Sequence, residues 1–314
     1  MIQTTKSIQA IQTNIERIIK GKAQAIELAV ACLLARGHLL IEDVPGVGKT
    51  TLAHALARSL DCSFSRIQFT SDLLPSDILG VSVFLQQQQR FEFRPGPIFA
   101  NIVLADEINR TTPKTQSSLL EAMNEAQVSI DNQTYPLPDP FMVIATQNPI
   151  EHHGTFPLPE SQLDRFLLRI RIGYPDSAEE KKILDRHQTM HPAEELQPVV
   201  SLQEALDLQQ ATEKVRVDDT LLDYLLAIVS ATRRSELLAL GVSTRGALAV
   251  QQAAKALALS RDRDYCLPDD IKDMAPAVLA HRVVLKTGLV SRGRQFEESE
   301  QIIRDLVESV PVPL

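Results

Sequence analysis

The sequence predicts an α/β fold, a parallel sheet sandwiched by helices, followed by an all-helical domain. In the first half, short apolar runs alternate with helical segments, the pattern of a parallel sheet with right-handed crossovers. One of these runs, residues 38–42, leads through a Gly/Pro turn into a helix. After Tyr174-Pro175 the apolar periodicity is helical only. We therefore expect two domains, residues 1–173 and 174–314.

The first half divides into strands, helices and two hairpins. Residues 83–94 and 127–137 alternate apolar and polar positions around a polar tip, which predicts β-hairpins. Ser76 is a candidate cap, after Pro75, for a short helix. The predicted helices cover 5–20, 22–36, 49–60, 113–126 and 158–166, and the predicted strands cover 38–42, 64–69, 102–105, 141–145 and 167–172.

The second half carries helix start signals. Ser201 and Glu204 have the spacing of a capping box, and Pro268 followed by two aspartates favours a helix start. The predicted helices cover 177–189, 201–213, 219–234, 243–260, 268–280 and 297–309.

Composition restricts the class of protein. The 314 residues are 44% hydrophobic and carry a net charge of −8, and residues 1–173 hold 15 basic against 17 acidic side chains. This balance disfavours a dedicated duplex-DNA reader, so no nucleic-acid partner is expected. No apolar run reaches membrane-spanning length, and the N-terminus has no apolar signal region. Cys32, Cys62 and Cys266 show no CxxC spacing, so we expect reduced core cysteines and a cytoplasmic protein without membrane insertion.

The turn after residues 38–42 has the layout of a P-loop, which binds phosphate. Gly46 and Gly48 let the backbone turn tightly and point N–H groups at an anion, and the following helix adds the positive end of its dipole. Lys49 supplies a mobile charge for the outer phosphates, and the Thr50 hydroxyl is an oxygen ligand for Mg²⁺. Asp43 stands where the general pattern has glycine. The alternative is an ordinary strand–turn–helix corner, but the Gly-Lys-Thr-Thr context favours a nucleotide site comprising Asp43, Val44, Pro45, Gly46, Val47, Gly48, Lys49, Thr50 and Thr51.

Two further apolar runs end in polar residues. Asp106 and Glu107 follow residues 102–105, and Asn148 lies three residues after 141–145. Because ligands collect at the carboxyl ends of parallel strands, we expect these side chains to converge on one γ-phosphate. Asp106 would hold Mg²⁺ with Thr50, Glu107 would polarise the attacking water, and Asn148 would orient that water. The alternative for Asp106 and Glu107 is a solvated strand end, which the P-loop at this distance disfavours.

With these motifs in place, the chain closely resembles the MoxR family of AAA+ ATPases. Gly48-Lys49-Thr50 alone is shared with unrelated ATPases, whereas the full set extends in order over nearly the whole chain. The matching segments are residues 42–50, 66–77, 106–110, 145–149, 158–166 and 243–246.

The resemblance implies roles for further residues. Asn148 corresponds to sensor 1, Arg165 to the arginine finger and Arg245 to sensor 2 of the lid. The two hairpins resemble the helix-2 and pre-sensor inserts of the clade. Without the resemblance, Arg165 could instead pair with Asp164, and Arg245 could be a surface charge beside its cap Ser243. A finger acts in trans, so the resemblance implies a ring, expected to be a hexamer.

The expected function is an ATP-hydrolysing chaperone or remodelling factor, with ATP and Mg²⁺ as cofactors. The resemblance implies a client protein that is matured or supplied with a metal or cofactor, with a von Willebrand factor A-type partner. The alternatives are an ATP-dependent motor acting on nucleic acid and an ATP-gated module with little hydrolysis. A GTPase is disfavoured because no Asn-Lys-x-Asp stretch follows the P-loop.

Other candidate sites are weaker. His187 and His191 lack a third metal ligand, and a polar loop explains His152 and His153. Phe91 and Phe93 could grip a client, but we expect them to pack.

Overall fold

The computed structural model describes residues 2–149, 154–175, 177, 179–181, 192–286 and 295–313. The elements of the first half are α1 (Ile2–Glu16), α2 (Ala23–Leu34), β1 (Leu39–Glu42), α3 (Lys49–Ser59), β2 (Phe64–Gln68), α4 (Pro75–Leu79), β3 (Gly80–Leu85), β4 (Arg90–Pro95), β5 (Ile102–Asp106), η1 (Ile108–Arg110), α5 (Pro113–Glu125), β6 (Gln127–Ile130), β7 (Gln133–Pro136), β8 (Met142–Gln147), α6 (Glu160–Leu163) and β9 (Leu168–Ile170). Those of the second half are η2 (Pro192–Glu195), α8 (Leu202–Glu213), α9 (Asp219–Arg234), β10 (Leu238–Leu240), α10 (Thr244–Ser260), α11 (Pro268–Leu279), β11 (Val284–Leu285) and α12 (Gln295–Ser309).

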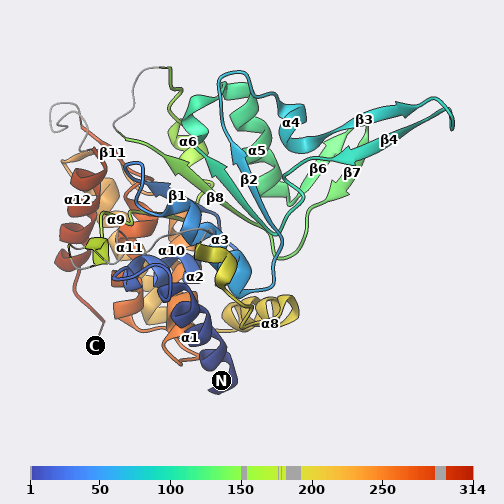
Figure 1. Cartoon of the computed structure of the whole chain (residues 1–314). Helices are drawn as coiled ribbons and strands as arrows, with labels where there is room; N and C mark the ends of the chain where they lie inside the picture. Colours follow the sequence, from blue (N-terminus) through green and yellow to red (C-terminus); the bar gives the residue numbers. More distant parts are fainter. Residues whose placement is uncertain are drawn as a thin grey trace.

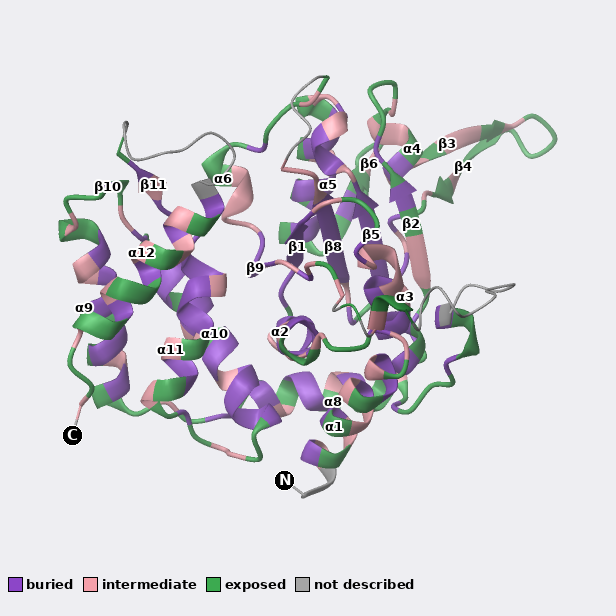
Figure 2. Ribbon diagram, turned by 60° about the vertical axis from the view of Figure 1, so that its left-hand side comes forward, coloured by how far each residue is buried: buried purple, intermediate pink, exposed green. Residues whose placement is uncertain are grey.

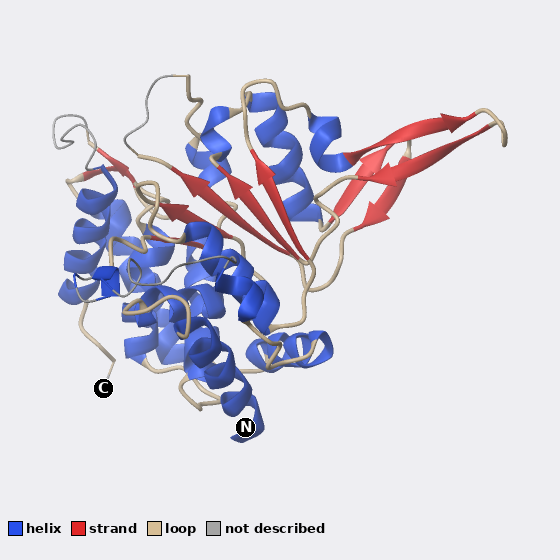
Figure 3. Cartoon of the chain, in the orientation of Figure 1, coloured by secondary structure: helices blue, strands red, loops and turns tan. Residues whose placement is uncertain are grey.

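The centre of the fold is a five-stranded parallel sheet with the strand order β2-β5-β8-β1-β9. Helices cover both of its faces, with α5 and α6 on one side and α2 and α3 on the other, and α1 packs on α2 and α3 (Figures 1 and 3). The predicted α/β fold with a parallel sheet is therefore confirmed. Because the strands are parallel, the segments that follow β1, β5 and β8 all leave the sheet at the end where the strands have their C-termini. We call this end of the sheet the carboxyl edge, and the end where the strands begin the amino edge.

Alternate residues of each central strand pack into two separate apolar clusters. In β1, Leu39 and Ile41 face the cluster that contains α1, α2 and α3, whereas Leu40 faces the cluster formed with α5. Burial on both faces explains why the central strands read as unbroken apolar runs. The first cluster also includes Val250 of α10 and Met274 of α11. The helices of the second half therefore share one apolar core with α1 and α2, and the domain boundary at residue 173 stays a prediction.

Both predicted hairpins are confirmed. β3 pairs with β4, and β6 pairs with β7, each antiparallel. The β3–β4 hairpin projects far from the body of the molecule (Figure 1) and is mostly half-buried or exposed (Figure 2). Phe93 packs as predicted, with its ring stacked on Tyr135 at 4.1 Å, so the two hairpins touch. The packing expected for Phe91 is wrong, because this residue is 71% exposed and its only described ring contact is with Phe84, which is itself exposed.

Two expectations for helices are corrected. The helix expected near 158–166 is only α6, because the chain then turns into β9. The N–H of Leu167 donates to the carbonyl of His38, and the carbonyl groups of Asp164, Phe166 and Leu167 accept hydrogen bonds from Arg282 of the second half. Ser76 does not cap α4. Leu74 occupies the cap position, and its backbone N–H donates to the Asp77 carboxylate at 2.9 Å.

The second half follows the predicted helices with one exception. β10 and β11 form a two-stranded antiparallel sheet, so the expectation of helices only is wrong there. The capping box of Ser201 and Glu204 is confirmed, as is Pro268 at the start of α11.

All three cysteines are free and buried. No helix in the described part of the chain has the length and apolar character needed to cross a membrane. Most of the predicted helix 177–189, together with His152, His153, His187 and His191, lies outside the described residues.

Candidate functional site

The P-loop connects β1 to α3 at the carboxyl edge. Gly46 and Gly48 adopt φ angles of +86° and +93°, a region that side chains with a Cβ rarely occupy. A Cβ at either position would meet no atom within 4 Å, so the backbone angle is what requires glycine there. Gly48 is the N-cap of α3, and the helix begins at Lys49. The first turn of α3, with Thr50 and Thr51, therefore presents its N–H groups and dipole to the loop.

Asp43, which stands where the general P-loop pattern has glycine, has a structural role. Its buried carboxylate accepts hydrogen bonds from the backbone N–H groups of Val44 at 2.8 Å, Ile172 at 2.8 Å and Gly173 at 2.6 Å. A glycine could form none of these contacts. Asp43 thus ties the start of the P-loop to the segment that leaves β9.

Lys49 lies at the carboxyl edge among acidic side chains. Its ammonium group donates to the backbone carbonyl of Asp43 at 2.6 Å. Partial burial lowers the pKa of Lys49, and the negative charges of Asp43, Asp106 and Glu107 oppose that shift. Because β1 and β5 both pair in parallel with β8, Lys49 at the start of α3 lies at the same end of the sheet as the two acids predicted at the end of β5.

The two acids at the end of β5 point in different directions. The Asp106 carboxylate accepts from the Thr146 hydroxyl at 2.7 Å and from the Arg66 guanidinium at 2.6 Å. Glu107 adopts a left-handed backbone conformation with φ 59° and ψ 48°. For a residue with a Cβ this costs about 1–2 kcal/mol, which is typical of strain kept at functional sites. The backbone N–H of Glu107 donates to the Thr146 hydroxyl at 2.9 Å, which supports this conformation.

Neighbouring side chains hold the Glu107 carboxylate. Gln68 donates to it at 2.8 Å, and the Arg110 guanidinium lies 3.2 Å away. Sequence reasoning gave no role to Arg66, Gln68 or Thr146. The available signal was that Arg66 and Gln68 occupy alternate positions of β2, the strand that pairs with β5.

The residues at this edge suit a magnesium–nucleotide complex. Thr50 and Asp106 supply the hard oxygen ligands that Mg²⁺ prefers, and such sites take the remaining ligands from phosphate and water. Across the described residues, no group of three or more His, Cys, Asp or Glu side chains could hold a metal by itself. Asn148 follows β8, and its neighbour Gln147 has a buried amide nitrogen without a hydrogen-bond partner in the described protein. That orphaned donor suits an anionic ligand at the carboxyl edge.

Arg165 lies at the amino edge instead. The segment that contains it enters β9, and the N–H of Leu167 donates to the carbonyl of His38, just before β1, at 2.8 Å. The Arg165 guanidinium donates to the carbonyl of Leu120 in α5 at 2.6 Å. Asp164 pairs with Arg282 and Arg245, and no ion pair between Asp164 and Arg165 is found within the described residues.

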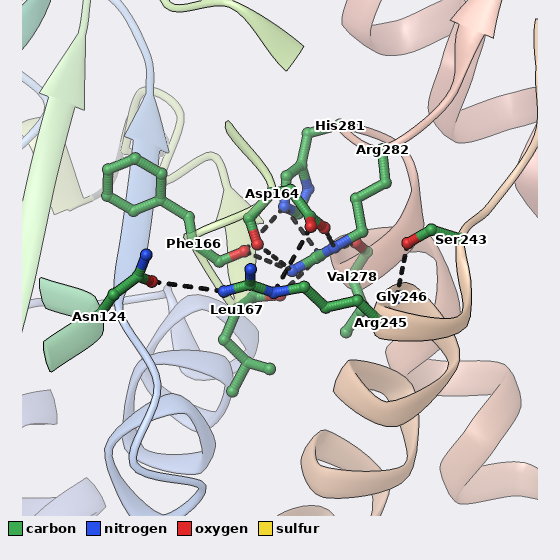
Figure 4. A network of polar contacts seen from close by, with 10 residues as sticks. All are labelled: Asn124, Asp164, Phe166, Leu167, Ser243, Arg245, Gly246, Val278, His281 and Arg282. Carbon is green, nitrogen blue, oxygen red and sulfur yellow. Dashed lines mark hydrogen bonds and ion pairs between the residues drawn. The ribbon is translucent and has the colours of Figure 1, made fainter. Parts of the chain in front are cut away.

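Arg245 contacts Asp164, the residue that precedes Arg165 in the chain. Its side chain is 59% exposed, 3.5 Å from the Asp164 carboxylate, and donates to the Asn124 side chain at 3.3 Å (Figure 4). Ser243 caps α10 as expected. The length of β1, about 13 Å for four residues, separates this edge from the P-loop. The structure therefore places both Arg165 and Arg245 against α5, away from Lys49 of the same chain.

Arg282 is a structural residue that the sequence did not reveal. Its side chain is 4% exposed and donates to the Asp164 carboxylate at 2.8 Å, to the carbonyls of Phe166 and Leu167, and to Val278. Burial lowers the pKa of Arg282, and the negative charge of Asp164 opposes that shift. The network fixes the segment before β9 against α11 (Figure 4).

Two segments of the chain match known protein families. Residues 38–168 match the ATPase family associated with various cellular activities (AAA). Residues 230–306 match the AAA lid domain. The matched segments coincide with the sheet that carries the P-loop and with the helices α10 to α12.

Relatives extend over nearly the whole chain. An uncharacterized protein of Bacillus subtilis, YeaC, is 50% identical over 96% of this chain and 93% of its own length. Chaperone MoxR1 of Mycobacterium tuberculosis is 45% identical over 87% of this chain and 74% of its own length. Protein MoxR of Methylorubrum extorquens is 31% identical over 96% of this chain and 94% of its own length. The crystal structure of a candidate ATPase from Cytophaga hutchinsonii, 37% identical, superposes with a TM-score of 0.89 over 100% of this chain and 97% of that one.

Proposed function

The chain belongs to the MoxR family of AAA+ ATPases, and from this premise we propose that it hydrolyses ATP to remodel a client protein. The observation that carries the proposal is that Lys49, at the start of α3, and Asp106 and Glu107, at the end of β5, lie at the same end of the parallel sheet. Phosphoryl transfer to water depends on positioning and charge neutralisation more than on covalent chemistry. This set of side chains meets both needs.

Each residue at the carboxyl edge has a distinct role in the proposal. The loop N–H groups and Lys49 bind the phosphates, while Thr50 and Asp106 would hold Mg²⁺, which neutralises phosphate charge when bound. Glu107 accepts a proton from the attacking water, and Asn148 orients that water. Gln68 and Arg110 both engage Oε2 of Glu107, and these contacts leave Oε1 to accept the proton of the attacking water.

Arg165 and Arg245 act on the site of a neighbouring subunit in this proposal. Both lie at the amino edge, separated from the P-loop of their own chain by the length of β1, about 13 Å, which supports action in trans. A contact between the amino edge of one subunit and the carboxyl edge of the next is head-to-tail. Contacts of this kind close into rings when the rotation allows it, and the family leads us to propose six subunits.

The client-facing part of the proposal rests on the hairpins. The exposed Phe84 and Phe91 on the β3–β4 hairpin support contact with another protein, since exposed aromatic residues are favoured at interfaces. The name of the M. tuberculosis relative, a chaperone, supports the same role. We further propose that the remodelling matures an enzyme complex or inserts a metal or cofactor into it, together with a von Willebrand factor A-type partner. The proposed location is the cytoplasm.

Mixing inactive subunits tests the site. Lys49→Ala should abolish ATP binding, whereas Glu107→Gln should retain it and lower turnover by about 100-fold or more. Arg165→Ala subunits keep an intact carboxyl edge, and Glu107→Gln subunits keep an intact Arg165. Mixed assemblies of these two variants should therefore recover part of the turnover, measured as phosphate release.

The matched control is a mixture of Lys49→Ala and Glu107→Gln subunits. Both variants are defective at the carboxyl edge, so this mixture should stay inactive. If the first mixture also stays inactive in assemblies shown to be mixed, the action of Arg165 in trans is refuted. A Glu107→Gln variant with normal turnover would refute the proposed hydrolytic site.

A further inference from the structure

The Asp164 carboxylate is held rigidly by its buried partner. Arg282 binds one carboxylate oxygen through its Nε at 2.8 Å and the surrounding carbonyls through its other nitrogens. This contact leaves the second oxygen, Oδ2, facing Arg245. Asp164 is therefore a fixed acceptor, one side of which is available to the exposed Arg245.

Arg245 is held far more loosely than Arg282. Its two oxygen partners lie at 3.5 Å, on Asp164, and at 3.3 Å, on Asn124, and more than half of its side chain is exposed. Exposed contacts of this kind contribute little to folding stability. They do, however, restrict the direction of a long side chain that has many rotamers in water.

Helix α5 contacts both arginines. Arg165 donates to the carbonyl of Leu120, and Arg245 donates to the side chain of Asn124. These two helix residues are four positions apart, which is about 6 Å along the helix axis. The same rigid element thus fixes one guanidinium group and steers the other.

We propose that Asn124 is a positioning residue that, with Asp164, aims Arg245 beside Arg165 for the nucleotide phosphates of a neighbouring subunit. This inference rests on the proposed function, in which both arginines act in trans. Asn124 does not touch the nucleotide. It acts by limiting the orientations of Arg245 before the neighbouring subunit docks.

A double-mutant cycle in ATP turnover tests the proposal with the full chain. Asn124→Ala should lower kcat roughly fivefold with little change in KM, since an exposed contact of this size changes an equilibrium by about that factor. Arg245→Ala should lower kcat further, and the double variant should be no worse than Arg245→Ala alone. Asn124→Asp, which keeps an acceptor oxygen, should restore turnover to near the unmodified level.

Two controls separate positioning from folding. Asn124 is exposed, so Asn124→Ala should leave the melting temperature unchanged. Glu121→Ala, also exposed on α5, should leave both turnover and melting unchanged.

Three outcomes would overturn the inference. Additive losses in the double variant, or normal turnover of Asn124→Ala beside an impaired Arg245→Ala, would refute it and leave the proposed function intact. Normal turnover of Arg245→Ala would refute it together with the role of Arg245 in trans. Whether the carboxyl edge hydrolyses ATP is decided separately by Glu107→Gln.

Discussion

His38 makes the folded protein sensitive to mild acid. The imidazole Nδ1 accepts a hydrogen bond from the N–H of Val143 at 3.0 Å, so the ring is neutral, and its Nε2 lies 3.0 Å from the carbonyl of Met123. Burial lowers the pKa of His38 from its ordinary 6.5 to about 4. Between these two values the unfolded chain binds more protons than the folded one, so the free energy of unfolding falls as the pH falls.

The size of this effect follows from the two pKa values. The full shift corresponds to about 3 kcal/mol, and about 2 kcal/mol of it is lost between pH 7 and pH 5. His38→Gln and His38→Asn remove the titration and replace the ring with neutral amides. Urea unfolding of the unmodified protein and both variants, at pH 7 and pH 5 and one protein concentration, isolates the contribution of His38.

The unmodified protein should lose about 2 kcal/mol more than either variant between these pH values, whatever the variants cost at pH 7. Burial also lowers the pKa of His281, but His281 is present in all three proteins and cancels in the comparison. Equal losses in the unmodified protein and in both variants would refute the assignment of a neutral, buried His38.

Two further predictions concern Asp43 and the aromatic residues of the β3–β4 hairpin. Asp43→Asn should destabilise the fold by about 2 kcal/mol, because the carboxylate accepts hydrogen bonds from three backbone N–H groups, whereas Asp223→Asn, at an exposed position, should not. Thermal melting measures both variants, and equal melting temperatures of the two variants would contradict the anchoring role of Asp43. Phe93→Ser should lower the free energy of unfolding by about 2 kcal/mol and Phe91→Ser by less than about 0.5 kcal/mol, because only Phe93 packs on Phe99 and Tyr135. A larger loss of stability for Phe91→Ser than for Phe93→Ser would contradict the geometry of the hairpin.

The central sheet could be predicted because its signals are local. Each buried strand is an apolar run that ends in a turn or a polar residue, as β5 does at Asp106. Gly46 and Gly48 at a strand-to-helix junction identify the P-loop for the same reason. The convergence of Lys49, Asp106 and Glu107 then followed from the rule that parallel strands share one carboxyl edge.

The remaining features depend on contacts between distant parts of the chain. Arg282 donates to the carbonyl groups of Asp164 and Phe166, more than a hundred residues away in the segment that follows α6, and no local pattern indicates these bonds. Asp43 is anchored by Ile172 and Gly173, so its role was invisible in the loop sequence. The contacts of Arg165 and Arg245 with α5 likewise could not be predicted without the strand order, because they depend on where β9 begins relative to β1.

Helix α5 connects the contacts of the two arginines with those of the hairpins. Leu120 and Asn124 engage the two arginines near its C-terminal end, and β6 starts two residues after Glu125. The β6–β7 hairpin is stacked in turn on β4 through Tyr135 and Phe93. One continuous helix therefore links the contacts of both arginines to the two hairpins, and only Ala126 lies between α5 and β6.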